Sequence, residues 1–386
     1  MIKGFKIRLY PTKQQEELIW KHIHACRFIW NYMLDLQETR YRNGEKHLSA
    51  FSMINLITSL RRDEDKTWLC EVSRTALERV CSDLETAYQG FFKSSFGHPR
   101  FKSRHKAKPA YPVRCDSLSF SEFYVKIAKL GKVRYRSDHT FPQGKGHKFS
   151  NVRLAFVNGK YILSFGMECE NQTPTLNNVS MGIDLGIKEL AVVACGDQRL
   201  VFHNINKSKK VRSINRRIRL LQRSISRKYE ASKSRTGRYE KTNNILREES
   251  RLRKLHARMA NIRQDYLHQT THALVSMLPR TVVMEDLNVS GMMKNKHLSK
   301  AIAEQGFYEF IRQMRYKCEG FGIEFIQVDR FYPSSKTCSC CGNIKHDLKL
   351  SDRTYVCPAC GFTIDRDMNA AINLMRYADH EERAAA

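Results

Sequence analysis

The chain opens with a strand pattern that is followed by a helical one. Residues 2–10 (IKGFKIRLY) alternate apolar and polar side chains, which predicts a β-strand. Thr12 and Gln15 then form a T-x-x-Q capping box ahead of apolar residues at helical spacing. Helices are predicted over three stretches, around residues 19–34, 51–62 and 72–95. The lone strand needs partners from later in the chain, so these helices form an insertion.

Strand patterns return between residues 117 and 169. Several runs alternate apolar and polar residues, and Asn158-Gly159 between two of them is a strong hairpin signal. We expect these strands to complete a small barrel with the strand at 2–10. The basic, proline-broken segment 96–112 precedes them, and its charge suits a solvated linker and a phosphate contact equally well. Residues 170–177 form a polar linker, which is the predicted main domain boundary.

The second half of the chain has the pattern of an α/β domain. The predicted elements are, in order, three strands from residue 178 to 204, helices at 207–230 and 252–266 with a break at Ser232–Gly237, a strand ending in Glu285, a helix at 298–320, a strand at 322–329 and a helix from about Met368 to Tyr377. This order matches a ribonuclease H-like layout. The two long helices form a basic hairpin, and its charge favours phosphate contact over a merely solvated surface.

Composition adds a strong charge imbalance to this picture. The 386 residues include 67 Lys and Arg against 39 Asp and Glu, which gives a net charge of +28. Such a charge favours a polyanionic partner, with nucleic acid as the leading candidate and an anionic membrane surface as the alternative. No apolar run is long enough to span a bilayer, and the first residues carry charges unlike those of a signal peptide. We therefore expect a cytoplasmic protein that does not act at a membrane.

Four of the twelve cysteines have the spacing of a zinc site. Cys338 and Cys341 form one CxxC pair, and Cys357 and Cys360 form a second pair fifteen residues further on. A glycine follows each pair and permits the tight turn that directs backbone amides toward the sulfurs. Cys340 lies inside this set, and the other cysteines are scattered singly, which fits a reducing cytosol better than a disulfide framework. The sequence therefore predicts a structural zinc ribbon.

Acidic residues stand at three predicted element ends. Asp184 ends a buried strand, Glu285 ends a second, and Asp365 or Asp367 opens the final helix. In open α/β sheets, sites form at the carboxyl ends of the strands, where converging carboxylates need a hard cation between them. Mg²⁺ suits such all-oxygen ligands, with Mn²⁺ as the alternative. Each acid taken singly also fits a turn, a surface residue or a helix cap, so the prediction depends on their combination with the cysteines and the charge.

Seven stretches of the chain resemble motifs of TnpB, a family of RNA-guided nucleases that bacterial insertion sequences encode and that is related to compact type V CRISPR effectors. They run in the expected order over almost the whole chain, and the last four are specific as a set: FKIRLYPT, FGHPRFKSR, GIDLGIKELAV, VVMEDLNV, SSKTCSCCG, YVCPACG and DRDMNAAINL. The resemblance implies an α/β fold with added all-β and all-α parts. The implied domains are a wedge-like β-barrel (1–12 and 110–172), a helical recognition lobe (13–109), a RuvC-like nuclease (177–337 and 362–380) and a zinc ribbon (338–361).

The same resemblance implies the site residues. Asp184 in IDLG, Glu285 in MEDL and Asp367 before x-N-A-A match three catalytic acids that hold magnesium, while Asp365 matches a neighbour that caps or orients. The family's zinc ligands match Cys338, Cys341, Cys357 and Cys360. The implied cofactors are structural Zn²⁺, catalytic Mg²⁺ and a guide RNA.

The implied activity is RNA-guided cutting of double-stranded DNA. A guide RNA from the transposon end would pair with a target strand beside a short duplex motif, and one RuvC-like site would hydrolyse both strands by two-metal-ion catalysis. The implied partners are guide RNA and target DNA, with one protein monomer per guide and no small-molecule substrate. Two alternatives stay open, a cleavage-deficient guided repressor and a strand-transfer transposase.

Overall fold

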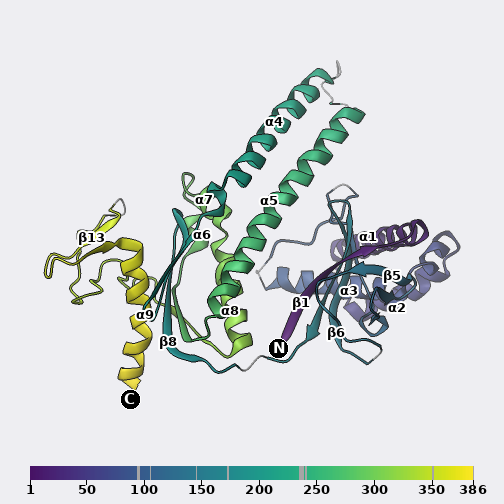
Figure 1. Ribbon diagram of the computed structural model, residues 1–386. Coiled ribbons are helices and arrows are strands. Elements are labelled where there is room, and N and C mark those ends of the chain that lie inside the picture. Colours follow the sequence, from purple (N-terminus) through teal and green to yellow (C-terminus); the bar gives the residue numbers. More distant parts are fainter. Residues whose placement is uncertain are drawn as a thin grey trace. The chain divides into compact units, whose positions relative to one another are not determined.

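The computed structural model describes residues 1–93, 96–104, 106–144, 146–171, 174–233, 239, 241–349 and 352–385. The chain divides into two compact units, Met1–Glu170 and Asn171–Ala386 (Figure 1). Several predicted features fall partly outside the described residues: the helix at 72–95, the segment 96–112, the strand region 117–169, the 170–177 linker, the helix break at Ser232–Gly237 and the ribbon at 338–361.

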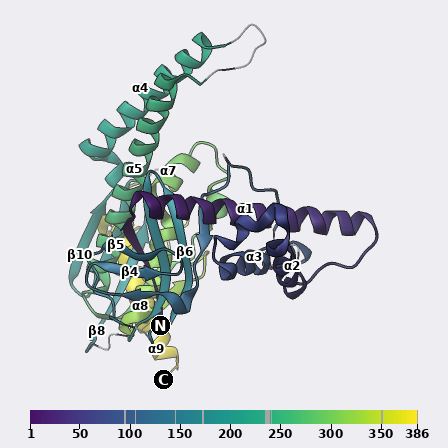
Figure 2. The same cartoon turned by 90° about the vertical axis from the view of Figure 1, so that its right-hand side faces the viewer.

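The helices of the first unit begin where the sequence predicts. They are α1 (Lys13–Arg42), α2 (Ala50–Arg62) and α3 (Arg74–Phe92), with short 3-10 turns at Glu64–Cys70 and Cys115–Ser117, and Figure 2 shows α2 and α3 beside α1. The capping box of α1 is confirmed, because Thr12 Oγ1 accepts from Gln15 N and Gln15 Oε1 accepts from Thr12 N. The Gln15 amide also donates to the Leu130 carbonyl oxygen, 3.0 Å away, which ties the start of α1 to the sheet.

The sheet of the first unit is built around its N-terminal strand. Its strands are β1 (Ile2–Tyr10), β2 (Ala110–Pro112), β3 (Ser119–Phe120), β4 (Tyr124–Ile127), β5 (Gly131–Arg136), β6 (Phe149–Val157) and β7 (Lys160–Glu168). Within the described residues the order is β2-β6-β7-β1-β5-β4-β3. β1 pairs antiparallel with β5 and β7, which confirms that the helices are inserted between β1 and its partners.

The predicted hairpin is confirmed, whereas the predicted barrel is wrong for the described strands. β6 and β7 pair antiparallel around Asn158 and Gly159, which both have positive φ (52° and 77°), as a tight hairpin turn requires. The sheet stays open because its edge strands, β2 and β3, do not pair with each other in the described part of the chain. Both edges are very short, and Pro112 in β2 has no N–H to donate to a closing ladder.

The second unit has a mixed sheet in which three neighbouring parallel strands run from the centre to one edge. Its strands are β8 (Asn177–Leu185), β9 (Glu189–Cys195), β10 (Gln198–His203), β11 (Pro279–Glu285) and β12 (Glu324–Val328), in the described order β10-β9-β8-β11-β12. β8, β11 and β12 are parallel, while β9 is antiparallel to both of its neighbours, β8 and β10. The buried strands read as nearly continuous apolar runs, as parallel strands covered on both faces do.

Helices cover both faces of this sheet. The helices of the unit are α4 (Lys209–Ala231), α5 (Asn243–Val275), α6 (Val289–Met292), α7 (Ser299–Gln305), α8 (Phe307–Phe321) and α9 (Arg366–Ala385), with a 3-10 turn at Ile205–Lys207. The side chains of α5 and α8 share a core with Met181 and Ile183 of β8. The side chains of α9 pack on the opposite face, against Val192 and Val283. No helix in the described part of the chain is both long and apolar enough to cross a membrane.

Several helix boundaries differ from the sequence prediction, and α5 (Asn243–Val275) extends beyond the predicted 252–266 at both ends. The single helix expected at 298–320 is two helices, because Gly306 adopts φ 71° and ends α7 before α8 starts. The last helix begins at Arg366 rather than at about Met368, since the Asp365 carboxylate accepts from the backbone N–H groups of Asp367 and Met368.

Candidate active site and metal centre

Asp184 and Glu285 lie side by side at the carboxyl ends of neighbouring parallel strands. In the β8–β11 register, Met284 is the partner of Ile183, so the next residues along, Asp184 and Glu285, follow at the same level. Both side chains are partly buried. Because successive side chains alternate between the faces of a strand, Asp184 shares its face with Gly182, and this is the face that α9 covers.

Helix α9 brings Asp367 to the same edge of the sheet. The helix passes directly over β8 at Gly182, where an added Cβ would lie 2.1 Å from the Ala371 carbonyl oxygen. Asp367 is one helical turn before Ala371, in the first turn of α9, and this turn lies toward the carboxyl end of β8. Asp365 is exposed and caps the helix, in agreement with the capping or orienting role that the sequence suggested.

The charges at this edge repel one another. The pKa of Asp184 is raised well above its ordinary value, first by burial and then by the carboxylates of Glu285 and Asp367. The Arg366 guanidinium opposes this rise but does not cancel it. The donor set is made of carboxylate oxygens only, although these three acids are not among the described groups whose ligand atoms lie close enough together to hold a metal ion. That chemistry fits a hard divalent cation such as Mg²⁺.

A buried serine holds Glu285 in place, a contact that sequence reasoning missed. The Ser334 hydroxyl donates to Glu285 Oε1, and Ser334 is only 2% exposed. The Ser334 carbonyl oxygen in turn accepts from the Asn373 amide of α9 at 2.7 Å. The helix that carries Asp367 is thereby linked to the side chain that orients Glu285. The spacing of Asn369 and Asn373, one turn apart in NAAIN, was the available signal.

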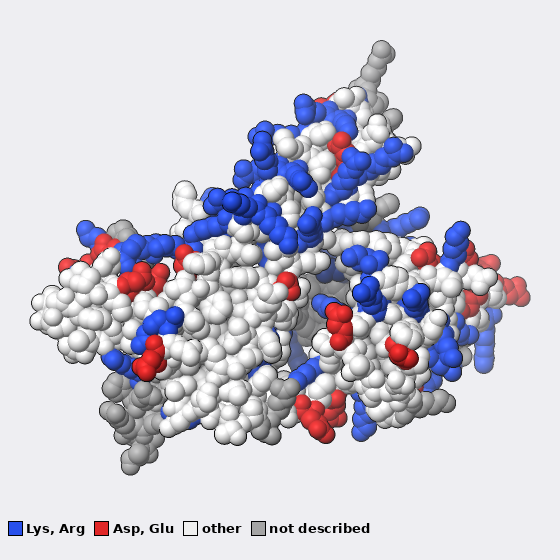
Figure 3. All heavy atoms as spheres, viewed as in Figure 1, with Lys and Arg blue, Asp and Glu red and all other residues white. Residues whose placement is uncertain are grey.

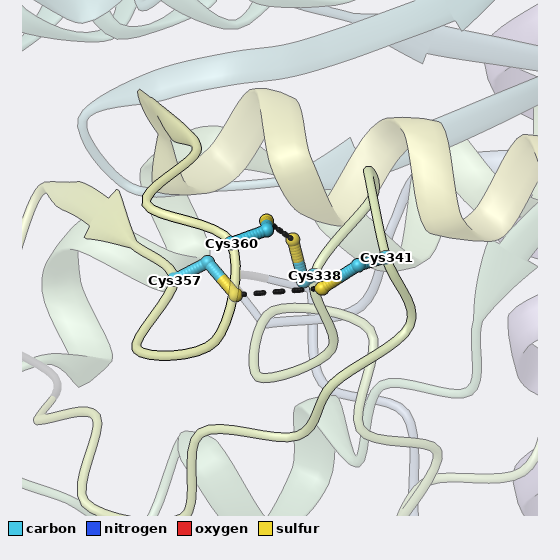
Figure 4. A group of neighbouring side chains, drawn as sticks. All are labelled: Cys338, Cys341, Cys357 and Cys360. Carbon is cyan, nitrogen blue, oxygen red and sulfur yellow. Dashed lines mark hydrogen bonds between the residues drawn. The ribbon is translucent and has the colours of Figure 1, made fainter.

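The four predicted cysteines come together. Their ligand atoms all lie within 4.8 Å of one another (Figure 4). Among the described His, Cys, Asp and Glu residues, this is the group of three or more whose side chains could hold one metal ion. The Sγ atoms are 3.8 Å apart in Cys338–Cys360 and 3.6 Å apart in Cys341–Cys357. Sulfurs bound to one tetrahedral zinc ion lie about 3.8 Å apart. The cluster therefore fits zinc.

The backbone around these cysteines is shaped for thiolates. Gly342 and Gly361 have φ values of 77° and 71°, and their N–H groups donate to the carbonyl oxygens of Cys338 and Cys357. The pKa of the Cys357 thiol is lowered to about 6, first by the backbone N–H of Cys360, whereas contacts with the neighbouring thiols raise the pKa of Cys341 and Cys360. The exposed Cys340 thiol is not one of the four clustered thiols, although the Cys340 backbone N–H donates to Cys338 Sγ at 3.4 Å.

The cysteine cluster is fastened to α9 by buried side chains. The Asn369 side chain, 0% exposed, accepts from the Ser339 N–H at 2.9 Å and donates to the Thr337 carbonyl oxygen at 2.7 Å. Arg376, two turns further along the helix, donates to the Ser339 carbonyl oxygen. A small antiparallel pair, β13 (Thr354–Val356) and β14 (Thr363–Asp365), then leads from the cluster into α9. The helix α9 thus contacts the cysteine loop, the Ser334 backbone beside Glu285 and the central sheet.

Comparison with known proteins matches most of the chain to family models. Residues 307–374 match a model described as "Cas12f1-like, TNB domain", which includes the cysteine cluster. Residues 164–296 match one described as "Probable transposase", and residues 1–46 match one described as "Helix-turn-helix domain".

Curated relatives match nearly the whole chain, and one solved structure shows a weaker similarity. "Putative RNA-guided DNA endonuclease InsQ" of Escherichia coli (strain K12) is 32% identical over 97% of this chain and 92% of its own length. "TnpB-like protein L770" of Acanthamoeba polyphaga mimivirus is 24% identical over 97% of this chain and 73% of its own. The protein in a cryo-EM structure of a Cas12f1-sgRNA-target DNA complex is 16% identical, covering 97% of this chain and 99% of its own, with a TM-score of 0.38. The chain belongs to the TnpB family.

Proposed function

We propose that this protein is an RNA-guided DNA endonuclease whose single active site contains Asp184, Glu285 and Asp367. The name of its E. coli relative supports the activity. The observation that carries the site is the repulsion at Asp184, whose pKa is raised by burial, Glu285 and Asp367 together. Partly buried acids of like charge at strand ends suit metal ligation far better than they suit stability.

Each side chain has a defined part in the proposed reaction. Asp184 provides carboxylate oxygens from the middle of the sheet, and Asp367 provides them from the first turn of α9. Ser334 donates to one oxygen of Glu285 and leaves the other for a metal ion. When bound, Mg²⁺ supplies an activated water and stabilises the leaving oxygen of a phosphodiester. The Cys338–Cys360 cluster would hold Zn²⁺ as a structural ion.

The basic hairpin supports a nucleic-acid partner. Lys and Arg side chains gather over α4 and α5 in Figure 3. On α4, five exposed arginines recur every three or four residues, and none forms an ion pair with a described residue: Arg212, Arg216, Arg219, Arg223 and Arg227. This spacing places them on one face of the helix. We propose that this arginine stripe contacts phosphates of the guide RNA or of its duplex with target DNA.

In this proposal, the guide pairs with one DNA strand beside a short duplex motif, and one RuvC-like site cuts both strands. The sheet and helices of Met1–Glu170 would form the wedge-like part (1–12 and 110–172) and the recognition lobe (13–109). The nuclease would comprise residues 177–337 and 362–380, with the zinc ribbon at 338–361. One protein monomer would bind each guide RNA.

A strand-transfer transposase is the second candidate, because residues 164–296 match a model of that description. The two functions differ in their need for RNA. Sequencing the RNA that copurifies with the protein separates them, since a guided nuclease carries a defined RNA and a transposase acting on transposon ends carries none.

The test of the proposed site is Asp184→Ala in the protein bound to its RNA. We expect Mg²⁺-dependent cutting of matching DNA to disappear, while zinc content, RNA binding and DNA binding stay at wild-type levels. Undiminished cutting by this variant would overturn the site. Binding without cutting by the wild-type protein would instead identify a guided repressor.

A further inference from the structure

A positively charged cavity lies inside the first unit and is lined by residues of that unit alone. It has a volume of about 510 Å³ and is lined by residues of α1, of α3, of the segments 102–104 and 107–110, of β2 and of β6. Five cationic side chains line it: Arg27, Lys102, Arg104, Lys108 and Arg153. Asp83 is the one carboxylate among its described lining residues.

The acid in this cavity is already engaged. Asp83 Oδ2 accepts from Arg153 at 2.6 Å, and Asp83 Oδ1 lies 3.8 Å from Arg79 Nε. Arg27, Lys102 and Arg104 have no carboxylate within ion-pair distance in the described part of the chain. The cavity therefore keeps an excess of positive charge.

Lys102 is held rigidly at the cavity wall. Its backbone N–H donates to Asn31 Oδ1 at 2.8 Å, and the Asn31 amide donates back to its carbonyl oxygen at 3.1 Å. The Trp30 indole donates to the Arg100 carbonyl oxygen at 3.0 Å, and the Lys102 ammonium lies 3.3 Å from the centroid of the Trp30 ring. Consecutive residues of α1 thus fix the segment that carries this cation.

The Lys102 ammonium is unfavourable in the free protein. Burial lowers the pKa of Lys102 to about 8, although Asp83 partly opposes this effect. The ammonium donates no hydrogen bond to a described residue. The neighbouring His24 also has a lowered pKa, through burial and through the charges of Arg27 and Arg104. A fixed, poorly solvated cation in a positive cavity is what an anion-binding site requires.

We propose that this cavity is a phosphate site, in which one phosphodiester group of a bound nucleic acid strand accepts a hydrogen bond from Lys102 among Arg27, Arg104 and Lys108. The inference rests on the proposed function for the identity of the polyanion, which is either the guide RNA or the target DNA. Both offer the same anionic oxygens, so the experiment must distinguish them.

The salt dependence of binding tests the site directly. Each phosphate contact adds about 0.7 to the slope of log K against log salt for a single strand and about 0.9 for duplex DNA. Two binding reactions are measured: the copurifying RNA with RNA-free protein, and matching duplex DNA with RNA-loaded protein. We expect Lys102→Met to lower the slope by about 0.7–0.9 in one of the two reactions. The probe that responds identifies the strand in the cavity. Lys102→Arg should keep the slope, and so should Lys21→Met, which removes an equal charge from the exposed Lys21–Glu71 pair on α1.

Two further measurements keep the test decisive. Without nucleic acid, Lys102→Met should melt at the wild-type temperature or higher, because it removes a desolvated charge. If Lys102→Met melts at a lower temperature than the wild type, the variant is partly unfolded and Arg104→Gln replaces it in the test. Arg104 is exposed, and its variant must then show the change in salt slope. Unchanged slopes in both variants overturn the phosphate site while leaving DNA cutting intact. If the wild-type protein neither cuts DNA nor carries RNA, the proposed function fails, and the slope with oligothymidylate still tests the cavity.

Discussion

Gly182 of β8 and Ala371 of α9 approach so closely that a Cβ on Gly182 would lie 2.1 Å from the Ala371 carbonyl oxygen. The same Cβ would lie 2.3 Å from the Met375 backbone nitrogen. These obstacles are backbone atoms, which cannot rotate away as a flexible side chain can. Glycine at position 182 therefore sets the distance between the strand that carries Asp184 and the helix that carries Asp367.

We predict that Gly182→Ala displaces α9 from β8. Overpacking of this kind typically destabilises by about 1–3 kcal/mol, and the shift of Asp367 should reduce cutting further than the loss of stability explains. Thermal unfolding and single-turnover cutting below the melting temperature measure the two effects. Gly4→Ala in β1 is the control, because nothing lies within 4 Å of its added Cβ. Full cutting by Gly182→Ala would show that this contact does not position the acid.

Asp184→Asn should stabilise the protein when magnesium is absent. The pKa of Asp184 is higher in the folded protein than in the unfolded chain, so stability falls as pH rises from about 4 toward the raised value. At neutral pH the neutral amide removes this repulsion. In buffer without EDTA and without magnesium, we expect Asp184→Asn to melt at a higher temperature than the wild type. Adding Mg²⁺ should raise the melting temperature of the wild type only. Equal melting curves at neutral pH would argue against a repulsive cluster.

Ser334→Ala should weaken magnesium binding at Glu285. Loss of a group that orients a metal ligand typically reduces metal affinity or activity about 10–100-fold. The Mg²⁺ concentration that gives half-maximal cutting should rise, while RNA binding stays unchanged. Ser335→Ala is a matched control, because the described contact of Ser335 is its carbonyl oxygen, which accepts from Asn369. An identical magnesium dependence in both variants would leave Ser334 with a packing role only.

Cys357→Ser should lose zinc and much of the DNA cutting. The cysteine loop is held to α9 through Asn369 and Arg376, so release of the loop should disturb the helix that carries Asp367. Zinc content by mass spectrometry and cutting rate should fall together. Cys340→Ser should change neither, because Cys340 is exposed and outside the cluster. Full-rate cutting by zinc-free Cys357→Ser would show that the two sites are independent.

Neutralising the arginine stripe should reduce the salt dependence of RNA binding. In Arg216→Gln/Arg219→Gln/Arg223→Gln, we expect the slope of log K against log salt to fall by about 2–3, if each arginine contacts one phosphate. The control is Arg74→Gln/Arg114→Gln/Arg312→Gln, which has the same charge change at arginines already paired with carboxylates. Equal slopes for the two triple variants would exclude a specific contact by the stripe.

Sequence patterns predicted the elements whose signals are local. The capping box at Thr12, the turn at Asn158-Gly159 and the four-cysteine cluster each depend on a few neighbouring residues or on fixed spacing, and each is present. Asp184 and Glu285 were singled out because they end apolar strands, and the parallel pairing of β8 and β11 brings them to one level.

Features that depend on contacts between distant segments escaped prediction. Whether a sheet closes depends on its two edge strands meeting, and alternation in β2 or β3 carries no information about that. Gly306 is visible in the sequence, but a glycine alone does not reveal the left-handed φ of 71° that ends α7 here. The Ser334–Asn373 contact joins residues far apart in the chain, and neither residue has a local pattern that names its partner.

The central place of β1 affects how the first unit is made on the ribosome. β1 is synthesised first, yet its neighbours β5 and β7 follow more than a hundred residues later. Arg8 can therefore pair only after Arg136 has been made, and Ile2 only after Glu168. During synthesis the helices α1 to α3 can form early from local contacts, whereas the sheet can assemble only after β7 emerges. Until β5 emerges, β1 is an unpaired strand with both edges exposed, and the edge that pairs with β7 stays exposed until β7 follows. The interval before β7 appears is when this chain is most open to aggregation and proteolysis.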